Sequence, residues 1–184
     1  DVEKGKPEDL CVNRAGNLFV ADTHYSRIVE FTPDGRLAGT FGSYGKAPGQ
    51  FIYPVGICCD SQGNVYVSEY GENDRIQKFD PTGHFLKQWG AFGQAPGQFQ
   101  RPSGICCATN DLLVVADAVN HRLQVFDSEG SLVRVIGREG TAAGEFRYPY
   151  DVAAAGDCMY VLEFGNQRVQ KLTLEGRPLG MMGR

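Results

Sequence analysis

The sequence predicts an all-β fold, a β-propeller built of four-stranded antiparallel blades. Short runs rich in β-branched and aromatic residues alternate with Gly, Asn and Asp turn signals, which is typical of strands in a meander. The proline that opens each unit recurs every 47 or 48 residues, at Pro7, Pro54, Pro102 and Pro149. An acid and an arginine recur in phase with it, at Asp22, Glu69, Asp117 and Glu163 and at Arg27, Arg75, Arg122 and Arg168. A period in the forties with four strands per unit indicates propeller blades.

We treat residues 1–184 as one propeller domain of four units, over residues 7–42, 51–90, 99–137 and 146–183, after a polar linker at residues 1–6. In the third unit the apolar runs predict strands at 104–108, 112–117, 122–127 and 131–137. The other units repeat this order, with strands expected at 10–13, 17–22, 27–32 and 36–42, at 56–60, 64–69, 75–80 and 85–90, and at 151–155, 159–163, 168–173 and 178–183. Each last hairpin carries a turn pair that ends in glycine, at Asp34-Gly35, Thr82-Gly83, Glu129-Gly130 and Glu175-Gly176.

Between the units lie three connections that each end in Gly-x-Phe. We interpret them as crossovers from the outer strand of one blade to the inner strand of the next. Their phenylalanines, Phe51, Phe99 and Phe146, are expected to fill the gap between neighbouring blades, where burying a large apolar side chain contributes roughly 1.5–3 kcal/mol.

Composition and charge narrow the function classes. A length of 184 residues and a hydrophobic content of 42% suffice for one domain with a core. A net charge of −4 disfavours a nucleic-acid backbone as partner, because such binders need basic patches. No apolar run approaches the roughly 18 residues of a membrane span, and no signal peptide is visible.

Five of the six cysteines fall on the expected inner strands, and two adjacent pairs, at residues 58–59 and 106–107, are among them. Neighbours along a strand point to opposite faces, so the two members of a pair do not form an ordinary disulfide with each other. We interpret these cysteines as small buried packing residues, since Ala153 and Ala154 occupy the same places in the last unit. The sequence leaves the localisation open. Reduced cysteines favour a reducing compartment, and among compartments they therefore favour the cytoplasm.

The units resemble the NHL repeat, named for an Asn-His-Leu signature. The third unit carries this signature as Asn120-His121-Arg122-Leu123 and the fourth as Asn166-Gln167-Arg168-Val169, whereas the first two units depart from it. The Pro-x-Gly-Ile, Val-Ala-Asp and Arg-hydrophobic-Gln-x-Phe elements extend the resemblance from residue 7 onward, and it is most specific to bacterial six-bladed NHL-repeat proteins. The resemblance implies a ring of six blades, of which this sequence holds four.

Three arrangements are therefore open: part of a six-bladed ring, a compact four-bladed ring, or an open arc that pairs with another chain. We favour the first. Each unit begins at an inner strand and ends at an outer strand, so no blade is shared between the two ends of the chain. If the ring is incomplete, exposed terminal blades predict self-association.

The acid and arginine of each unit are expected to pair across the turn between the second and third strands. Their repetition in every unit favours a structural role, because a catalytic group is normally unique. Binding specificity is expected instead at the variable turns of the rim and at the channel mouth. The candidate binding residues are His24, Tyr25, Tyr70, Glu72, Asn73, Asn120, His121, Tyr150, Phe164 and Asn166.

By the resemblance, the residues that follow each opening proline line one end of the central channel. This predicts a mouth formed by Glu8, Asp9, Val55, Ser103, Tyr150 and Asp151. No cofactor is expected; if a metal binds, Ca²⁺ held by hard oxygen ligands is the candidate, with Asp9, Asp151, Glu69 and Glu163 as its ligands. The three histidines lie at different depths of their units and do not predict a zinc site.

The sequence thus favours a binding or scaffold module without enzymatic activity, whose rim and channel mouth contact a protein or peptide. The alternative is a metal-dependent hydrolase or lyase of the six-bladed propeller type with its site at the channel. Nucleic acid is disfavoured as partner, since Glu72 and Asp74 stand on the rim among few arginines.

Overall fold

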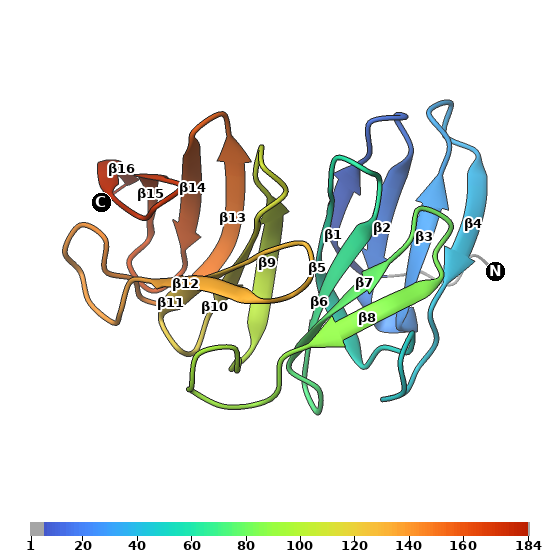
Figure 1. Cartoon of the computed structure of the whole chain (residues 1–184), viewed down its shortest axis with the longest axis horizontal. Helices are drawn as coiled ribbons and strands as arrows, with labels where there is room; N and C mark the ends of the chain where they lie inside the picture. Colours follow the sequence, from blue (N-terminus) through green and yellow to red (C-terminus); the bar gives the residue numbers. More distant parts are fainter. Residues whose placement is uncertain (1–5, 184) are drawn as a thin grey trace.

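The computed structural model describes residues 6–183, so the linker expected at residues 1–6 lies, apart from Lys6, outside the described residues. The chain folds into four successive four-stranded antiparallel sheets (Figure 1). Blade 1 contains β1 (Pro7–Val12), β2 (Leu18–Asp22), β3 (Arg27–Phe31) and β4 (Leu37–Phe41). Blade 2 contains β5 (Tyr53–Cys59), β6 (Val65–Tyr70), β7 (Arg75–Phe79) and β8 (Phe85–Trp89). Blade 3 contains β9 (Pro102–Cys107), β10 (Leu113–Asp117), β11 (Arg122–Phe126) and β12 (Leu132–Ile136). Blade 4 contains β13 (Pro149–Ala155), β14 (Cys158–Glu163), β15 (Arg168–Thr173) and β16 (Pro178–Gly183).

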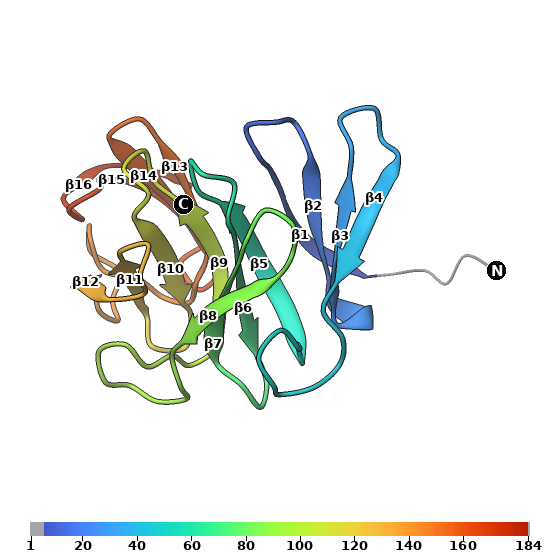
Figure 2. The same ribbon diagram turned by 45° about the vertical axis from the view of Figure 1, so that its right-hand side comes forward.

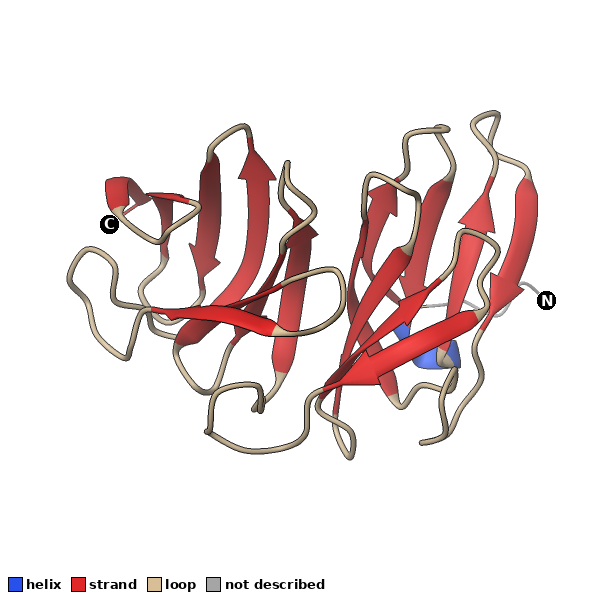
Figure 3. Ribbon diagram, viewed as in Figure 1, coloured by secondary structure: helices blue, strands red, loops and turns tan. Residues whose placement is uncertain are grey.

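The predicted propeller blades are confirmed, with strands in sequence order within every sheet. The inner strands β1, β5, β9 and β13 lie at the centre of the array, and β4 and β16 lie at opposite sides of it (Figure 1). Figure 2 shows the same succession of blades from another side, with blade 1 at one end. Among residues 6–183 the one helical element is a short 3-10 turn, η1 (Thr23–Tyr25), beside blade 1, and no helix there is long and apolar enough to cross a membrane (Figure 3).

The inner strands begin earlier than expected, at or just before the unit's proline. The proline pairs with the acid that ends the second strand, in the pairs Pro7–Asp22, Pro54–Glu69, Pro102–Asp117 and Pro149–Glu163. Proline lacks an N–H and is therefore tolerated near the start of a strand, where one ladder hydrogen bond is dispensable. A register shift follows each of these pairs, so the residues after the proline turn toward the channel.

The core consists of three apolar layers, one at each seam between neighbouring blades. Each layer contains one of the three crossover phenylalanines, and all three side chains are fully buried, as predicted: Phe51, Phe99 and Phe146. The glycine that closes the preceding blade makes room for that ring. A Cβ added at Gly42, Gly90 or Gly137 would lie 2.3–2.6 Å from the ring of the following phenylalanine. The glycine that closes each blade and the phenylalanine of the following Gly-x-Phe therefore pack together.

A buried network ties each crossover to the blade that it enters. In blade 2 the amide of Ile52 donates to Glu69 Oε2 at 2.8 Å, and Arg75 Nε donates to Glu69 Oε1 at 2.5 Å. Gln77 Nε2 donates to Glu69 and to the carbonyl of Gln50, and its Oε1 accepts from the amide of Gly49. The acid–arginine pairing predicted for all four units is confirmed, and its place in this network gives it a structural role.

Blades 3 and 4 repeat this network with Asp117, Arg122 and Gln124 and with Glu163, Arg168 and Gln170. Blade 1 departs from it, because Val29 stands where the other blades have glutamine. The side chain of Arg27 is 43% exposed, against 7–11% for the other three arginines, which donate to carbonyls of the crossovers.

The first and last blades each leave one face uncovered. Leu10 and Val12 on β1 point away from the seam with blade 2 and are each 60% exposed. On blade 4 the same holds for Leu162 and Met182, at 45% and 54%. The four blades therefore form an open array within the described residues. A six-bladed ring stays a prediction.

Replacing Arg75 by alanine is expected to cost about 3–5 kcal/mol of unfolding free energy, because Glu69 would remain buried without its charged partner. The matched change Arg27→Ala removes an arginine whose side chain is 43% exposed and which lies outside the full network, so it is expected to cost less than Arg75→Ala although its partner Asp22 is buried. Urea unfolding followed by Trp89 fluorescence measures both. Equal losses would contradict the assignment of the network to the buried seams.

Candidate functional site

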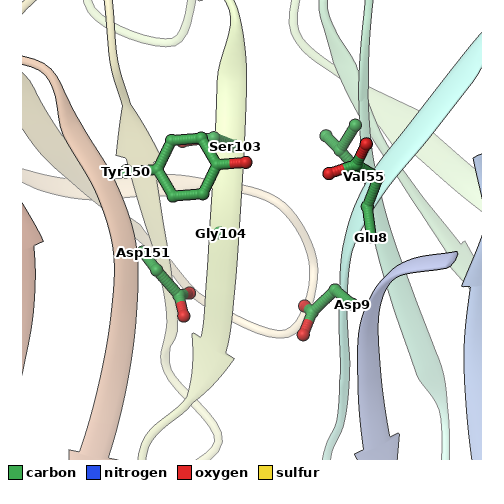
Figure 4. A pocket seen from close by; sticks show the side chains of 7 residues that line it. All are labelled: Glu8, Asp9, Val55, Ser103, Gly104, Tyr150 and Asp151. Carbon is green, nitrogen blue, oxygen red and sulfur yellow. The ribbon is translucent and has the colours of Figure 1, made fainter. Parts of the chain in front are cut away.

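The rim side of the blades carries a channel mouth and, beside it, an aromatic groove. The mouth is lined by Glu8, Asp9, Val55, Ser103, Gly104, Tyr150 and Asp151, one or two residues after the proline of each inner strand (Figure 4). All six residues expected there line this one pocket together, because each unit places the same register position there. That the pocket opens into a closed central channel stays a prediction from the resemblance.

Two carboxyl groups face one another across this mouth (Figure 4). Asp9 accepts hydrogen bonds from the amides of Ile57 at 2.9 Å and Leu10 at 2.8 Å, and Asp151 accepts from the amide of Val152 at 2.8 Å. Asp151 lies against the backbone of β9, since a Cβ at Gly104 would be 2.0 Å from its Oδ1. Only glycine at this position allows that approach.

Burial shifts both acids toward the neutral form. It raises the pKa of Asp9 to about 6 against the lowering effect of the two amides, and the negative charge of Asp151 adds to the rise. Burial likewise raises the pKa of Asp151. The mouth therefore favours a bound proton or a cationic group of a ligand.

The other two acids proposed as metal ligands lie elsewhere. Glu69 and Glu163 are buried in the crossover networks and paired with Arg75 and Arg168, each at 2.5 Å. Among residues 6–183 no three His, Cys, Asp or Glu side chains come together as a metal site would require. The structure therefore does not bring the four acids together. Glu69 and Glu163 lie on second strands and are buried at the seams between blades, whereas Asp9 and Asp151 lie on inner strands and line the mouth.

The aromatic groove lies between the rims of blades 3 and 4. It has a volume of about 280 Å³ and is lined by Arg101, Ser103, Ala118, Val119, Tyr148, Tyr150 and Phe164. Phe164 is 77% exposed, and Tyr148 and Tyr150 are 44% and 48% exposed. Large side chains this accessible beside a hollow are typical of a contact surface.

The rim turn of each preceding blade holds the residue before the proline in place. The amide of Tyr148 donates to His121 Nδ1 at 3.0 Å, and the two rings meet edge to face with centroids 4.5 Å apart. One blade earlier, the amide of Arg101 donates to Asp74 Oδ1 at 2.7 Å, and its guanidinium lies 4.9 Å from the ring centroid of Tyr70. Both Arg101 and Tyr148 have positive φ, 57° and 49°. These hydrogen bonds hold the backbone that carries the Arg101 and Tyr148 side chains in place.

Sequence reasoning missed Arg101 as a site residue. It stands at the position where units two and four carry Tyr53 and Tyr148, and this departure from the repeat was the available signal. Arg101 places a positive charge between two aromatic clusters of the rim.

The remaining predicted rim residues divide into exposed and internally bonded side chains. Asn120 donates to the carbonyl of Gly93 and to Asp117, and Asn166 makes the equivalent bonds to Gly140 and Glu163. The others lie on the rim as follows: His24 packs edge to face on Tyr25, Glu72 pairs with Lys46, Tyr70 stacks beside Tyr53, and Asn73 is half-buried. The two asparagines are occupied by the fold, and the exposed members of the predicted set are His24, Glu72, Tyr150 and Phe164.

Known proteins match this chain in sequence over its middle blades. The profile of the NHL repeat matches residues 51–79 and 99–126, which cover the first three strands of blades 2 and 3. Two of its blades therefore match the NHL repeat. "Protein brain tumor" of Drosophila melanogaster is 34% identical over 65 residues, which is 35% of this chain and 6% of that protein.

Solved structures match over nearly the whole chain. The virginiamycin B lyase from Staphylococcus aureus superposes with a TM-score of 0.73 at 18% identity, over 97% of this chain and 55% of that one. A chain of the Nidogen/Laminin complex gives a TM-score of 0.74 at 20% identity, over 100% of this chain and 65% of that one. At these identities the likeness shows the propeller fold alone. The chain spans little more than half of these relatives' length.

The carboxyl of Asp9 is expected to titrate near pH 6, and Asp151→Asn is expected to lower that midpoint by removing a neighbouring negative charge. A carboxyl whose pKa is raised from 3.8 stabilises the fold most at low pH, and this contribution is lost as the pH rises through about 6. Carbon-13 NMR of labelled aspartate carboxyls follows the titration. A midpoint near 4, or a midpoint that Asp151→Asn does not change, would contradict the electrostatic coupling of Asp9 to Asp151.

Proposed function

We propose that this NHL array is a binding module that takes a short peptide segment of a protein partner into the groove between blades 3 and 4. The observation that carries the proposal is the set of exposed aromatic side chains, Tyr148, Tyr150 and Phe164, around a hollow of about 280 Å³. This volume suits the anchoring side chain of a peptide, and exposed aromatic residues are frequent binding hot spots.

The charges around the groove define the chemistry of the partner. Arg101 borders the groove on one side, and the acids of the channel mouth lie beyond Tyr150 on the other. A complementary segment would have an aromatic or branched apolar anchor, with an acidic residue toward Arg101 and a basic residue toward Asp9 and Asp151. Such an arrangement fixes the direction of the peptide as well as its position.

The alternative, a metal-dependent hydrolase or lyase, has less support in the described residues. Asp9 and Asp151 are two carboxyl groups of raised pKa, and a protein site for Ca²⁺ takes six to eight oxygen ligands. Elemental analysis of the purified protein separates the two functions. Stoichiometric metal that is lost in Asp151→Ala would favour the enzyme.

Self-association of the array remains a prediction with a separate basis. The uncovered faces of blades 1 and 4 expose Leu10, Val12, Leu162 and Met182. Sedimentation velocity tests it: concentration-dependent dimers that Leu10→Lys disperses would support the prediction, and a monomer at all concentrations would contradict it.

Peptides selected from a random phage-displayed library against the protein are expected to use the groove. Phe164→Ala and Tyr150→Ala should each weaken the selected peptides about 30-fold, the effect of losing a central hot spot. Phe92→Ala is the matched control, because Phe92 is 70% exposed on the crossover from blade 2 to blade 3 and lies outside the groove. Fluorescence anisotropy measures the dissociation constants. Equal affinity of the Phe164→Ala and Phe92→Ala variants would reject the groove as the site.

A further inference from the structure

The adjacent cysteine pairs on the inner strands reach across two seams. Cys11 Sγ of β1 lies 3.3 Å from Cys59 Sγ of β5, and Cys58 Sγ of β5 lies 3.2 Å from Cys107 Sγ of β9. All four are free thiols. The two members of the pair Cys58-Cys59 point to opposite faces of their strand, as the sequence predicts, and each therefore meets a cysteine of a different neighbouring blade.

The sequence register of the inner strands explains which seams carry a thiol pair. Each inner strand has one position that faces the next blade and one that faces the previous blade. The forward positions hold Cys11, Cys58, Cys106 and Ala153, and the backward positions hold Val12, Cys59, Cys107 and Ala154. A thiol pair forms at the first two seams because both positions are cysteine there. At the third seam Cys106 faces a strand that carries Ala154 instead.

One member of each thiol pair lines a cavity. Cys59 and Cys107 border a cavity of about 230 Å³ at the ends of the inner strands opposite the acidic mouth. Their partners do not line this cavity: Cys58 is buried, and Cys11 is partly exposed. The hydrogen bond to Cys59 raises the pKa of the Cys11 thiol, and burial raises that of Cys58. Attack therefore begins at the cavity thiols, and the inner thiols complete the step.

We propose that the two seams are sites of oxidative cross-linking, Cys11 to Cys59 and Cys58 to Cys107, by a small-molecule disulfide that enters this cavity. The thiolate of Cys59 attacks one sulfur of the disulfide, forms a mixed disulfide and releases one thiol. Cys11 then loses its proton, attacks the sulfur of Cys59 and displaces the second thiol. Two protein thiols are oxidised, one small disulfide is reduced to two thiols, and the same exchange joins Cys107 to Cys58.

The sulfur atoms have little distance to travel. They must close from 3.2–3.3 Å to about 2.05 Å, the length of a disulfide bond. The bonds would close loops of 48 and 49 residues and join blades 1, 2 and 3 covalently. The seam between blades 3 and 4, which carries the aromatic groove, would keep no covalent link.

The experiment treats the folded protein with 2-hydroxyethyl disulfide, blocks the remaining thiols with N-ethylmaleimide and maps the linked peptides by mass spectrometry. Free thiols are expected to fall from six to two, Cys106 and Cys158, and the peptides that carry Cys11, Cys58-Cys59 and Cys107 are expected to be joined in one disulfide-linked set. The midpoint of thermal unfolding should rise by on the order of 10 °C, and a reductant should reverse it.

Single variants make the pairing specific. Cys59→Ala should abolish the link to Cys11 and retain the link between Cys58 and Cys107, whereas Cys107→Ala should do the reverse. Both are expected to fold, because Ala154 already occupies the equivalent position in blade 4. Cys106→Ala is the control and should keep both links. Absence of either link in the folded wild-type protein, or a link between Cys58 and Cys59 or between molecules in their place, would overturn the proposal.

Discussion

The buried carboxylate near the end of the second strand in blades 2 to 4 is the constraint on which the array of blades depends. In blades 2 to 4 it accepts hydrogen bonds from an arginine, a glutamine and the amide of the incoming crossover. The arginine and glutamine in turn donate to the carbonyls of the same crossover. One ionised group thus fixes three segments of chain, and the full set of partners is what makes its burial tolerable.

This network positions the candidate site through the backbone. The network fixes the position of the crossover along the blade. The proline that follows the crossover therefore pairs with the acid of its own blade, and one or two of the next residues line the mouth. Tyr150 and Asp151 reach the mouth by this route. The same fixed entry places Arg101 and Tyr148 against the rim turn of the preceding blade. Core and groove are therefore parts of one repeating arrangement.

The periodic features of the molecule could be predicted from the sequence, and those that depend on departures from the period could not. Blades, acid–arginine pairs and crossover phenylalanines recur in phase, so three or four copies of each signal reinforced one another, and the mouth residues followed from the resemblance. Arg101 replaces a tyrosine in a single unit, and its significance appears only when Tyr70 of another blade lies beside it. The cysteine contacts depend on how neighbouring inner strands are staggered, and no local pattern encodes a stagger between strands that share no hydrogen bonds. Alternation showed that Cys58 and Cys59 face opposite ways, but it did not identify the cysteine that each one meets.

Hydrogen exchange of the crossover amides tests the central role of the buried carboxylate most directly. Ile52, Gln100 and Arg147 precede their inner strands, and each amide donates to the acid of its blade at 2.8–2.9 Å. If these bonds hold the array together, the three amides exchange as slowly as the buried central strands and are released only when the blades unfold. Exchange at the rate of exposed turn amides, with the strands still protected, would contradict the account.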